Sequence, residues 1–350
     1  MDNSVIRQKY SRLASIFYFV LAWAIVWPAS GQQAGIERLP TQLLDVAAPS
    51  DRISGEPGSL RILSHSCSIL PIEEVRSRIV SIAVQEWAYF GFSIYDLTTS
   101  TESRETSQRP QARLARLSAA ESARVATSIA GYWAAVPDTG WILQRQNESW
   151  KARGMSSRWR DPWSAAFISW VMCESGLGDE EQFQRAIAHH AYIDQAITAR
   201  DRGDAAAAFV AYDTGEQAIN PGDLLCRGSR PAYQSLDQRR AQLGMGARTH
   251  CDIVVKLDQE SSQIQVIGGN VRGSVRLKKL PAQVNQAGHL TPLPYNGRRL
   301  FAHLKLQASP LSSNALDLTP TLHAVSCTRE LQLETTLALN LPAPALPLNC

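Results

Sequence analysis

The hydrophobic periodicity of the chain changes near Gly203, and this change restricts the fold more than any other feature of the sequence. Before it, apolar residues recur three and four positions apart, as they do on one face of a helix. After it, short runs of apolar and β-branched residues alternate with turn residues, as in strands joined by hairpins. Because helices come first and strands second, we predict an α+β domain with an antiparallel sheet rather than a doubly wound fold.

Four helices and five strands are expected. The helices are predicted over residues 71–90, 113–135, 160–176 and about 181–200. The strands are predicted over residues 221–228, 250–258, 263–271, 274–280 and 299–307. Residues 98–112 are polar and rich in turn formers, which is typical of a loop. Residues 136–160 carry scattered tryptophans without a period, and we interpret them as irregular.

The first 31 residues have the pattern of a secretory signal. A basic start is followed by an apolar run over residues 13–27 and by small residues at positions 29 and 31. The run is shorter than the roughly 20 residues that a spanning helix needs, so we expect contact with a membrane only through this segment, if it stays uncleaved. We therefore expect a bacterial protein of the periplasm or a secreted one.

The remaining chain divides into three predicted parts. Residues 32–60 read as a flexible leader, 61–307 as a single α+β domain, and 308–350 as a C-terminal tail that Cys327 and Cys350 could pin. The chain has six cysteines, an even number that favours disulfides in an exported protein. Cys226 and Cys251 lie in two predicted strands that could be neighbours in one sheet, and the alternative for them is buried free thiols.

The charge balance argues against nucleic acid as a partner. The chain has 35 basic and 32 acidic residues, and without the three basic and one acidic residue of segment 1–31 they number 32 and 31. Nucleic-acid binding needs a concentrated basic surface instead.

His190 and Asp194 share a helix face at a spacing that can hold a metal, but a third ligand is missing. We expect neither a metal nor another cofactor.

The helix at 160–176 carries a hydroxyl in its first turn. Asp161 is a suitable N-cap and Pro162 suits the first helical position, so Ser164 is not needed as a cap. Free backbone N–H groups near Ser164 would stabilise negative charge on an oxyanion. A serine hydroxyl still needs a base before it can act as a nucleophile.

His250, which begins a predicted strand, is the expected base. Alternation along this strand places His250 and Asp252 on one face and Cys251 on the other. Asn270 closes the next predicted strand. Either Asn270 or Asp252 could orient the imidazole, which is the usual third element of such a site. The alternative interpretation makes Asn270 a turn residue, because asparagine tolerates left-handed backbone conformation.

Four segments follow one another in an order typical of a known family. They read PWSAAFISWVMCESGL, PGDLLC, HCDIVV and VIGGN. Over roughly residues 71–280 the chain resembles the exported bacterial domain family numbered 2272. It more remotely resembles CHAP-type and other papain-like peptidoglycan amidohydrolases.

The resemblance implies a papain-like core with the nucleophile position at a helix N-terminus. It also implies an exported hydrolase that cuts amide bonds of peptidoglycan or cell-wall peptide. Ser164 takes the nucleophile position, His250 that of the base and Asn270 that of the orienting group. The CHAP-type enzymes have a thiol where this chain has a hydroxyl, and a hydroxyl paired with histidine does not ionise as a thiol does. The alternative is therefore a catalytically inactive envelope- or peptidoglycan-binding domain on the same scaffold.

Three further residues are candidates for contact with the substrate. Trp159 and Trp163 could line a groove for a sugar or a peptide, although packing is the commoner role of tryptophan. His190 is expected to line the substrate cleft close to the helix that carries Ser164.

Overall fold

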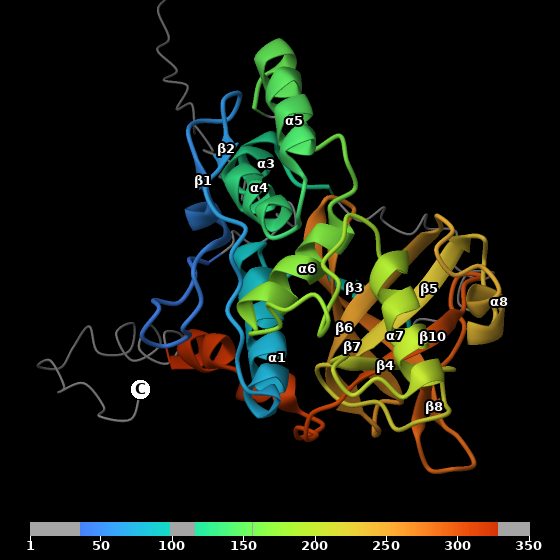
Figure 1. Ribbon diagram of the computed structural model, residues 1–350. Helices are drawn as coiled ribbons and strands as arrows, with labels where there is room; N and C mark the ends of the chain where they lie inside the picture. The colour runs from blue at the N-terminus through green and yellow to red at the C-terminus, as the bar shows by residue number, and fades with distance from the viewer. Residues whose placement is uncertain (1–35, 99–115, 156, 328–350) are drawn as a thin grey trace, which may run out of the picture. The chain divides into compact units, whose positions relative to one another are not determined.

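The computed structural model describes residues 36–98, 116–155 and 157–327 (Figure 1). The expected signal segment lies outside the described residues, as do most of the expected loop at 98–112 and the end of the tail. The described residues belong to one unit, Gln32–Cys350.

Helices dominate the first part of the chain, as expected. These helices are α1 (Ile72–Tyr89), α3 (Ala119–Arg124), α4 (Ala126–Ala134), α5 (Gly140–Arg153), α6 (Ser164–Glu174) and α7 (His190–Arg202). The short helix α8 (Leu236–Arg240) follows later, between β5 (Leu224–Arg230) and β6 (Arg248–Asp258). The helices expected over 71–90, 160–176 and about 181–200 are confirmed as α1, α6 and α7. The one expected over 113–135 is broken at Val125, which separates α3 from α4.

The prediction of an irregular segment over 136–160 was wrong, because α5 occupies most of it. This helix buries Ile142, Leu143, Gln146 and Trp150, which recur at helical spacing. Its other residues are mostly polar, and one member of the buried stripe is a glutamine. The apolar signal was therefore too sparse to indicate a helix.

The second part of the chain forms most of one large sheet. The strands are β1 (Ile53–Ser54), β2 (Arg61–Ile62), β3 (Ile94–Asp96), β4 (Phe209–Tyr212), β5 (Leu224–Arg230), β6 (Arg248–Asp258), β7 (Gln263–Val271), β8 (Ser274–Val284), β9 (Leu290–Pro292) and β10 (Leu300–Leu306). In the described residues the large sheet has eight strands in the order β3-β8-β7-β6-β5-β10-β4, with β9 beside β8. Within this described sheet, β3 and β8 pair in parallel and the other neighbours are antiparallel.

The expected α+β class is thus confirmed, and all five expected strands are present. The short strands β1, β2, β3, β4 and β9 were not expected. Each has two to four residues, too few to show an alternating pattern.

The two faces of the large sheet have different neighbours. Helices α1 and α6 pack on β6 and β7, and α7 packs on β4 (Figure 1). Along β6, Cys251, Ile253 and Val255 belong to the core shared with these helices. Val254 belongs instead to a second apolar cluster with Leu225 of β5 and others from β7, β8 and β9. Residues on β6 with even numbers therefore lie on the face away from α6.

Two disulfides join distant parts of the described chain. The bond between Cys226 and Cys251 links β5 to β6, where these residues are direct partners, so the expected pairing is confirmed. The bond between Cys67 and Cys173 ties the segment before α1 to α6. Cys350 lies outside the described residues, and the pinning of the tail by Cys327 and Cys350 stays a prediction. Disulfides of this kind are consistent with an oxidising location outside the cytoplasm.

The described parts of the expected leader and tail contribute to the fold. Residues 36–60 contain the 3₁₀ helix η1 (Pro49–Arg52) and strand β1. They bury Leu44 and Val46 in the main core. After β10, the 3₁₀ helix η2 (Ala315–Leu318) packs its first two residues on the same core, and residues 320–327 are helical.

The carboxylate of the Gly-Asp segment at 222–223 has a structural role. Asp223 is fully buried and receives hydrogen bonds from Arg76 of α1 and His303 of β10, both at 2.8 Å. It also accepts the backbone N–H groups of Asn220 and Leu306. A buried carboxylate needs such partners, and here they join α1, β5 and β10.

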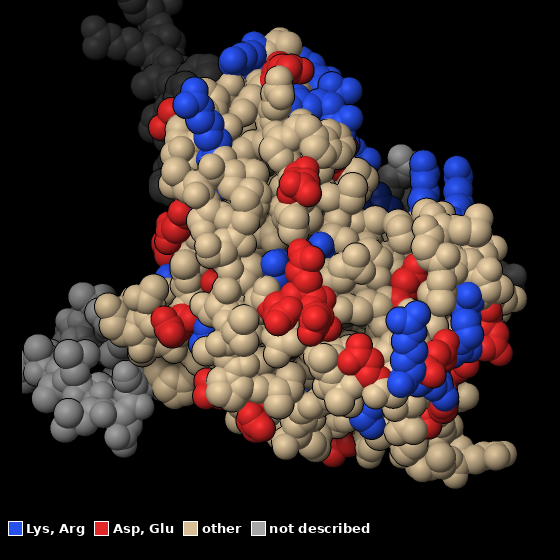
Figure 2. Space-filling model, viewed as in Figure 1, with Lys and Arg blue, Asp and Glu red and all other residues tan. Residues whose placement is uncertain are grey.

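Basic and acidic side chains are interspersed over the face of the molecule shown in Figure 2. In the described residues, no helix is both long enough and apolar enough to span a membrane.

Candidate functional site

Ser164 is the first residue of α6 and is half-buried. The expected N-cap is not formed, because both carboxylate oxygens of Asp161 bind the guanidinium group of Arg145. The helix begins two residues after Pro162, and Trp163 occupies the cap position without a side-chain hydrogen bond. The predicted roles of Asp161 and Pro162 at the helix start were therefore wrong. The position of Ser164 in the first turn is confirmed.

The hydroxyl of Ser164 contacts an imidazole other than the expected one. Its Oγ lies 2.7 Å from Nε2 of His189, the residue just before α7. His189 is only 3 % exposed. The sequence offered a weak signal for it, the His-His pair at 189–190. Nothing in that pair distinguishes the histidine that turns inward.

The other ring nitrogen of His189 determines where the proton lies. Nδ1 accepts the backbone N–H of Cys251 at 3.2 Å and also contacts the hydroxyl of Tyr192. A backbone amide can only donate, so Nδ1 carries no proton. Burial, with a smaller contribution from the neighbouring His250, lowers the pKa of His189 well below 6.5 and keeps the ring neutral. The single proton is then on Nε2, which donates it to the Ser164 hydroxyl.

The amide of Cys251 is available to His189 because β6 and β7 separate at this point. Their pairing runs from Asp258 to Ile253 on β6 and does not continue to Cys251. The register of β7 shifts between Gly268 and Val271, where the strand bulges. The His189 imidazole takes the hydrogen bond that β7 would otherwise have received.

His250 belongs to a second polar group. Its Nε2 lies 3.0 Å from Asp252 Oδ1, and Lys278 forms an ion pair with the other oxygen of Asp252. Asp252 is 1 % exposed and Lys278 4 %. Burial alone would raise the pKa of the Asp252 carboxyl, but Lys278 and His250 outweigh it and hold that pKa well below its usual range. Asp252 thus stays ionised and accepts the Nε2 proton of His250.

This arrangement leaves Nδ1 of His250 as the unprotonated nitrogen. Burial lowers the pKa of His250, and the attraction of Asp252 only partly offsets this effect. The ring is therefore neutral, with its proton held at Nε2 by a carboxylate. This tautomer is the one that a general base requires.

Ser164 and His250 both contact His189, the first by a hydrogen bond and the second by a ring contact. Among the described residues no hydrogen bond joins Ser164 to His250, and the rings of His189 and His250 meet edge to face with their centroids 5.1 Å apart. The neighbours of Gly268 and Gly269 show what lies on each face of β7. A Cβ on Gly268 would meet Asp252 and His250, whereas a Cβ on Gly269 would meet Phe167 of α6. The His250–Asp252 pair therefore lies on the face away from α6. The catalytic roles of these residues stay predictions.

Asn270 lies in the bulge of β7 with a φ of 57°. Asparagine tolerates this left-handed conformation better than most residues, which accounts for it at this position. It also lines the same cleft as His250. The structure brings Asn270 close to the candidate base, and it accommodates the turn interpretation as well.

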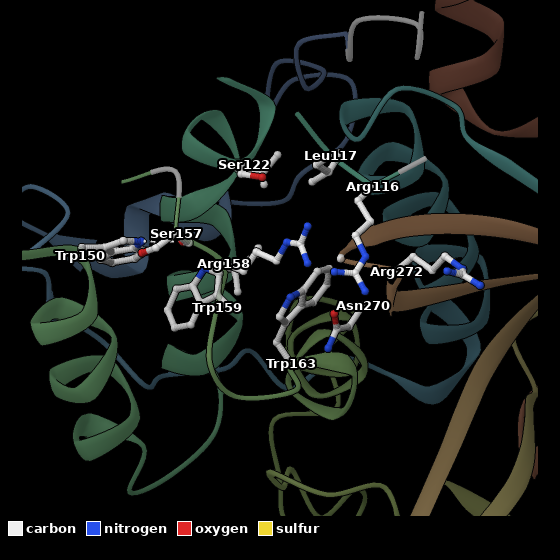
Figure 3. A pocket seen from close by; sticks show the side chains of 13 residues that line it. Arg116, Leu117, Ser122, Trp150, Ser157, Arg158, Trp159, Trp163, Asn270 and Arg272 are labelled. Carbon is white, nitrogen blue, oxygen red and sulfur yellow. Dashed lines mark hydrogen bonds between the residues drawn. The ribbon is translucent and has the colours of Figure 1, made fainter. Parts of the chain in front are cut away.

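The two candidate tryptophans line a pocket that we call the aromatic pocket (Figure 3). Its volume is about 260 Å³, and its lining residues include Arg116, Leu117, Ser122, Val125, Ile129, Trp150, Ser157, Arg158, Trp159, Trp163, Asn270, Arg272 and Gly273. Trp163 is buried, with Arg158, Arg116 and Asn270 around it. The indole Nε1 of Trp159 is buried and has no partner in the described part of the chain. Ser157, which also lines the pocket, has a buried hydroxyl without a partner in the same part of the chain. The pocket is therefore lined by flat aromatic surfaces and by two unpaired polar groups.

A larger neighbouring cavity, which we call the basic cleft, has a volume of about 480 Å³. Its lining residues are Tyr95, Leu97, Arg227, His250, Asn270, Val271, Arg272, Lys278, Tyr295, Asn296 and Arg298. Asn270 and Arg272 line both cavities, so the two meet at the β7–β8 hairpin. Sequence reasoning missed the cleft, because its cationic side chains come from four separated segments.

His190 lies elsewhere. It donates from Nδ1 to the carbonyl of Ala247 at 3.2 Å and lines a separate pocket with Asp194. Asp194 is held by two 2.6 Å hydrogen bonds from Arg239 and is not free to bind a metal. Within the described residues there is no group of three or more potential metal ligands.

Comparison with known proteins places the chain in a family. Residues 122–296, half of the chain, match the family model described as "Uncharacterized protein conserved in bacteria (DUF2272)". The chain belongs to this family. The matched region runs from within α3 to beyond β9 and contains Ser164, His189, His250 and Asn270. No curated protein and no solved structure matches the chain. The resemblance to CHAP-type amidohydrolases, and with it a papain-like core, stays a prediction.

Proposed function

We propose that this chain is an exported envelope protein that binds peptidoglycan or a cell-wall peptide and does not cut it through Ser164. One observation carries the second half of this proposal: the Ser164 hydroxyl accepts a proton from His189 instead of facing an unprotonated nitrogen. A serine becomes a nucleophile only when a base removes its proton. In this tautomer His189 cannot do so.

The adjoining cavities support the binding half of the proposal. Tryptophan faces stack on sugar rings and peptide planes, and an unpaired indole N–H provides a directed hydrogen bond. Trp159 supplies such a donor, and Arg158 and Asn270 provide polar groups beside it. The resemblance to peptidoglycan hydrolases and the signal-like first 31 residues point to the cell envelope as the place of binding. The proposal requires no metal and no other cofactor.

A second candidate function is hydrolysis of an amide bond in the same ligand. The 2.7 Å contact between Ser164 and His189 favours it, because a nucleophile and its base lie at such a distance. In this reaction Ser164 Oγ attacks the carbonyl carbon while Nε2 takes the hydroxyl proton and returns it to the amine that leaves as the C–N bond breaks. Water then cleaves the resulting acyl ester and restores the Ser164 hydroxyl. The proton on His189 would first have to move to Nδ1, which would displace the Cys251 N–H from that nitrogen and require Tyr192 to accept the new hydrogen bond.

Binding is tested by co-sedimentation of the purified protein with bacterial peptidoglycan. We expect the protein to sediment with the sacculi, and we expect Trp159→Ala to weaken binding about tenfold, the upper range for one buried aromatic contact. Trp141→Ala is the matched control, since Trp141 is half-exposed and lies outside the aromatic pocket. Absence of co-sedimentation, or equal weakening by both variants, would contradict the proposal.

Hydrolysis is tested in the same samples by chromatography of released fragments, with wild type, Ser164→Ala and Ser164→Cys. The binding proposal predicts no fragments from wild type. Fragments from wild type that disappear in Ser164→Ala would establish the second candidate function instead. Fragments from Ser164→Cys alone would show a site that lacks only an ionisable nucleophile.

A further inference from the structure

We propose that the basic cleft binds an oxyanion that carries two or more negative charges, such as a phosphate or a polycarboxylate group. This inference goes beyond the proposed function and stands without it, because it concerns a different cavity and a different ligand chemistry.

The first support is an excess of unpaired positive charge. Arg227, Arg272 and Arg298 line the cleft and form no ion pair within the described residues. None of the lining residues is acidic. The nearby carboxylate of Asp252 is already neutralised by Lys278. Guanidinium groups present several N–H donors in one plane, which is the geometry that phosphate and carboxylate groups accept.

The second support is independent of charge. Tyr295 lines the cleft and is only 8 % exposed, and its hydroxyl has no hydrogen-bond partner in the described part of the chain. A buried hydroxyl without a partner costs free energy that a bound ligand would recover. Burial raises the pKa of Tyr295 to about 12, and Asp252 adds to this effect. The phenol therefore keeps its proton and offers it to an acceptor.

Two of the arginines that line the cleft act electrostatically on both Tyr295 and Lys278. The electrostatic neighbours of Tyr295 include Asp252, Arg227 and Arg298, and those of Lys278 include the same two arginines. One bound oxyanion could thus accept a hydrogen bond from the Tyr295 hydroxyl and lie close to both guanidinium groups. Because the lining donors so outnumber the acceptors, an anionic acceptor fits better than a sugar or a cation.

The test is isothermal titration calorimetry of the full mature chain with pyrophosphate and, separately, with citrate. We expect saturable binding of at least one of them at low ionic strength, weakening as salt is added. Arg227→Gln and Arg298→Gln should each weaken binding about tenfold or more, since each removes a charge-assisted hydrogen bond. Preference for pyrophosphate would identify a phosphate site, and preference for citrate a carboxylate site.

Two variants make the result specific. Arg299→Gln removes the same charge next to Arg298 but outside the cleft, so it should bind as wild type does. Tyr295→Phe removes one oxygen atom and should weaken binding severalfold while the fold is kept. If an arginine variant fails to fold, Tyr295→Phe still tests the proposal. The proposal is overturned if neither anion binds, or if Arg299→Gln weakens binding as much as Arg227→Gln.

Discussion

The hydroxyl of Ser164 and the carboxylate of Asp252 each accept the Nε2 proton of a histidine, so the two rings have the same tautomer and differ in their partners. Asp252 accepts the Nε2 proton of His250 and leaves Nδ1 basic. Ser164 accepts the Nε2 proton of His189, whose Nδ1 is occupied by the Cys251 amide. The imidazole that is held by a carboxylate is therefore not the one that contacts the serine.

Replacing Ser164 by alanine should destabilise the fold, because it leaves the buried N–H of His189 without a partner. An unpaired buried donor costs about 1–3 kcal/mol. Urea unfolding measures this change in the free energy of unfolding. Ser157→Ala is a matched control, since the buried Ser157 hydroxyl has no partner in the described residues. Equal losses in the two variants would mean that the contact between Ser164 and His189 contributes nothing.

His189 should also make stability depend on pH. Its pKa in the folded chain lies well below 6.5, so the unfolded chain takes up its proton more readily. The stabilisation from neutral His189 is fully present above pH 6.5 and declines as the pH falls below that value. His250 acts in the same direction, since its folded pKa is also lowered.

Thermal unfolding at a series of pH values from about 8 to 5 checks this dependence. We expect the midpoint temperature of unfolding to fall as the pH is lowered in wild type, and to fall less steeply in His189→Gln. In His323→Gln, which changes an exposed ring, the slope should match that of wild type. A midpoint that rises on acidification, or a slope unchanged in His189→Gln, would show that His189 is not held neutral.

At the scale of elements, the two consecutive glycines of β7 allow structure on both sides of the strand. Gly268 leaves room for the His250–Asp252 pair, and Gly269 lets Phe167 of α6 pack directly on the strand. The following bulge, with Asn270 in the left-handed region, then directs the chain into the β7–β8 hairpin. The segment VIGGN is explained by these contacts whether or not Asn270 takes part in catalysis.

Gly269→Ala should weaken the packing of α6 on β7. The added Cβ would lie 2.5 Å from the Phe167 side chain, closer than packed carbon atoms approach. Overpacking of this kind costs about 1–3 kcal/mol, measured by urea unfolding. Gly246→Ala is the control, because its added Cβ would meet nothing within 4 Å. An unchanged stability in Gly269→Ala would mean that α6 can shift without loss.

At the scale of the whole molecule, two disulfides within the described residues tie segments of the chain that are separated in sequence. The bond from Cys67 to Cys173 spans 106 residues and anchors the segment before α1 to α6. The bond from Cys226 to Cys251 spans 25 residues and lies within the sheet. The longer loop restricts the unfolded chain more strongly.

Removal of the Cys67–Cys173 bond by alanine substitution of both residues should therefore cost more stability than removal of the bond between Cys226 and Cys251. The chain-entropy relation gives a difference of about 1 kcal/mol. Unfolding in guanidinium chloride of the two double variants and of wild type measures it. The reverse order would mean that native packing around Cys226 and Cys251 outweighs loop entropy.

The sequence by itself determined the order of helices and strands and the first-turn position of Ser164, and it indicated the pairing of Cys226 with Cys251 as one of two alternatives. These features follow from periodicity and local alternation, which depend on residues a few positions apart. It did not reveal α5, whose buried stripe is sparse, or β3, β4 and β9, which are too short to show a period.

Only the tertiary structure decided which imidazole reaches Ser164. His189 and Cys251 are 62 positions apart, and their contact exists because the pairing of β6 with β7 ends at Ile253 and leaves the Cys251 amide to the imidazole that precedes α7. The same holds for the basic cleft, whose arginines come from β5, the β7–β8 hairpin and the segment before β10. Such contacts arise from the packing of whole elements against one another, and no short-range pattern in a sequence records how those elements meet.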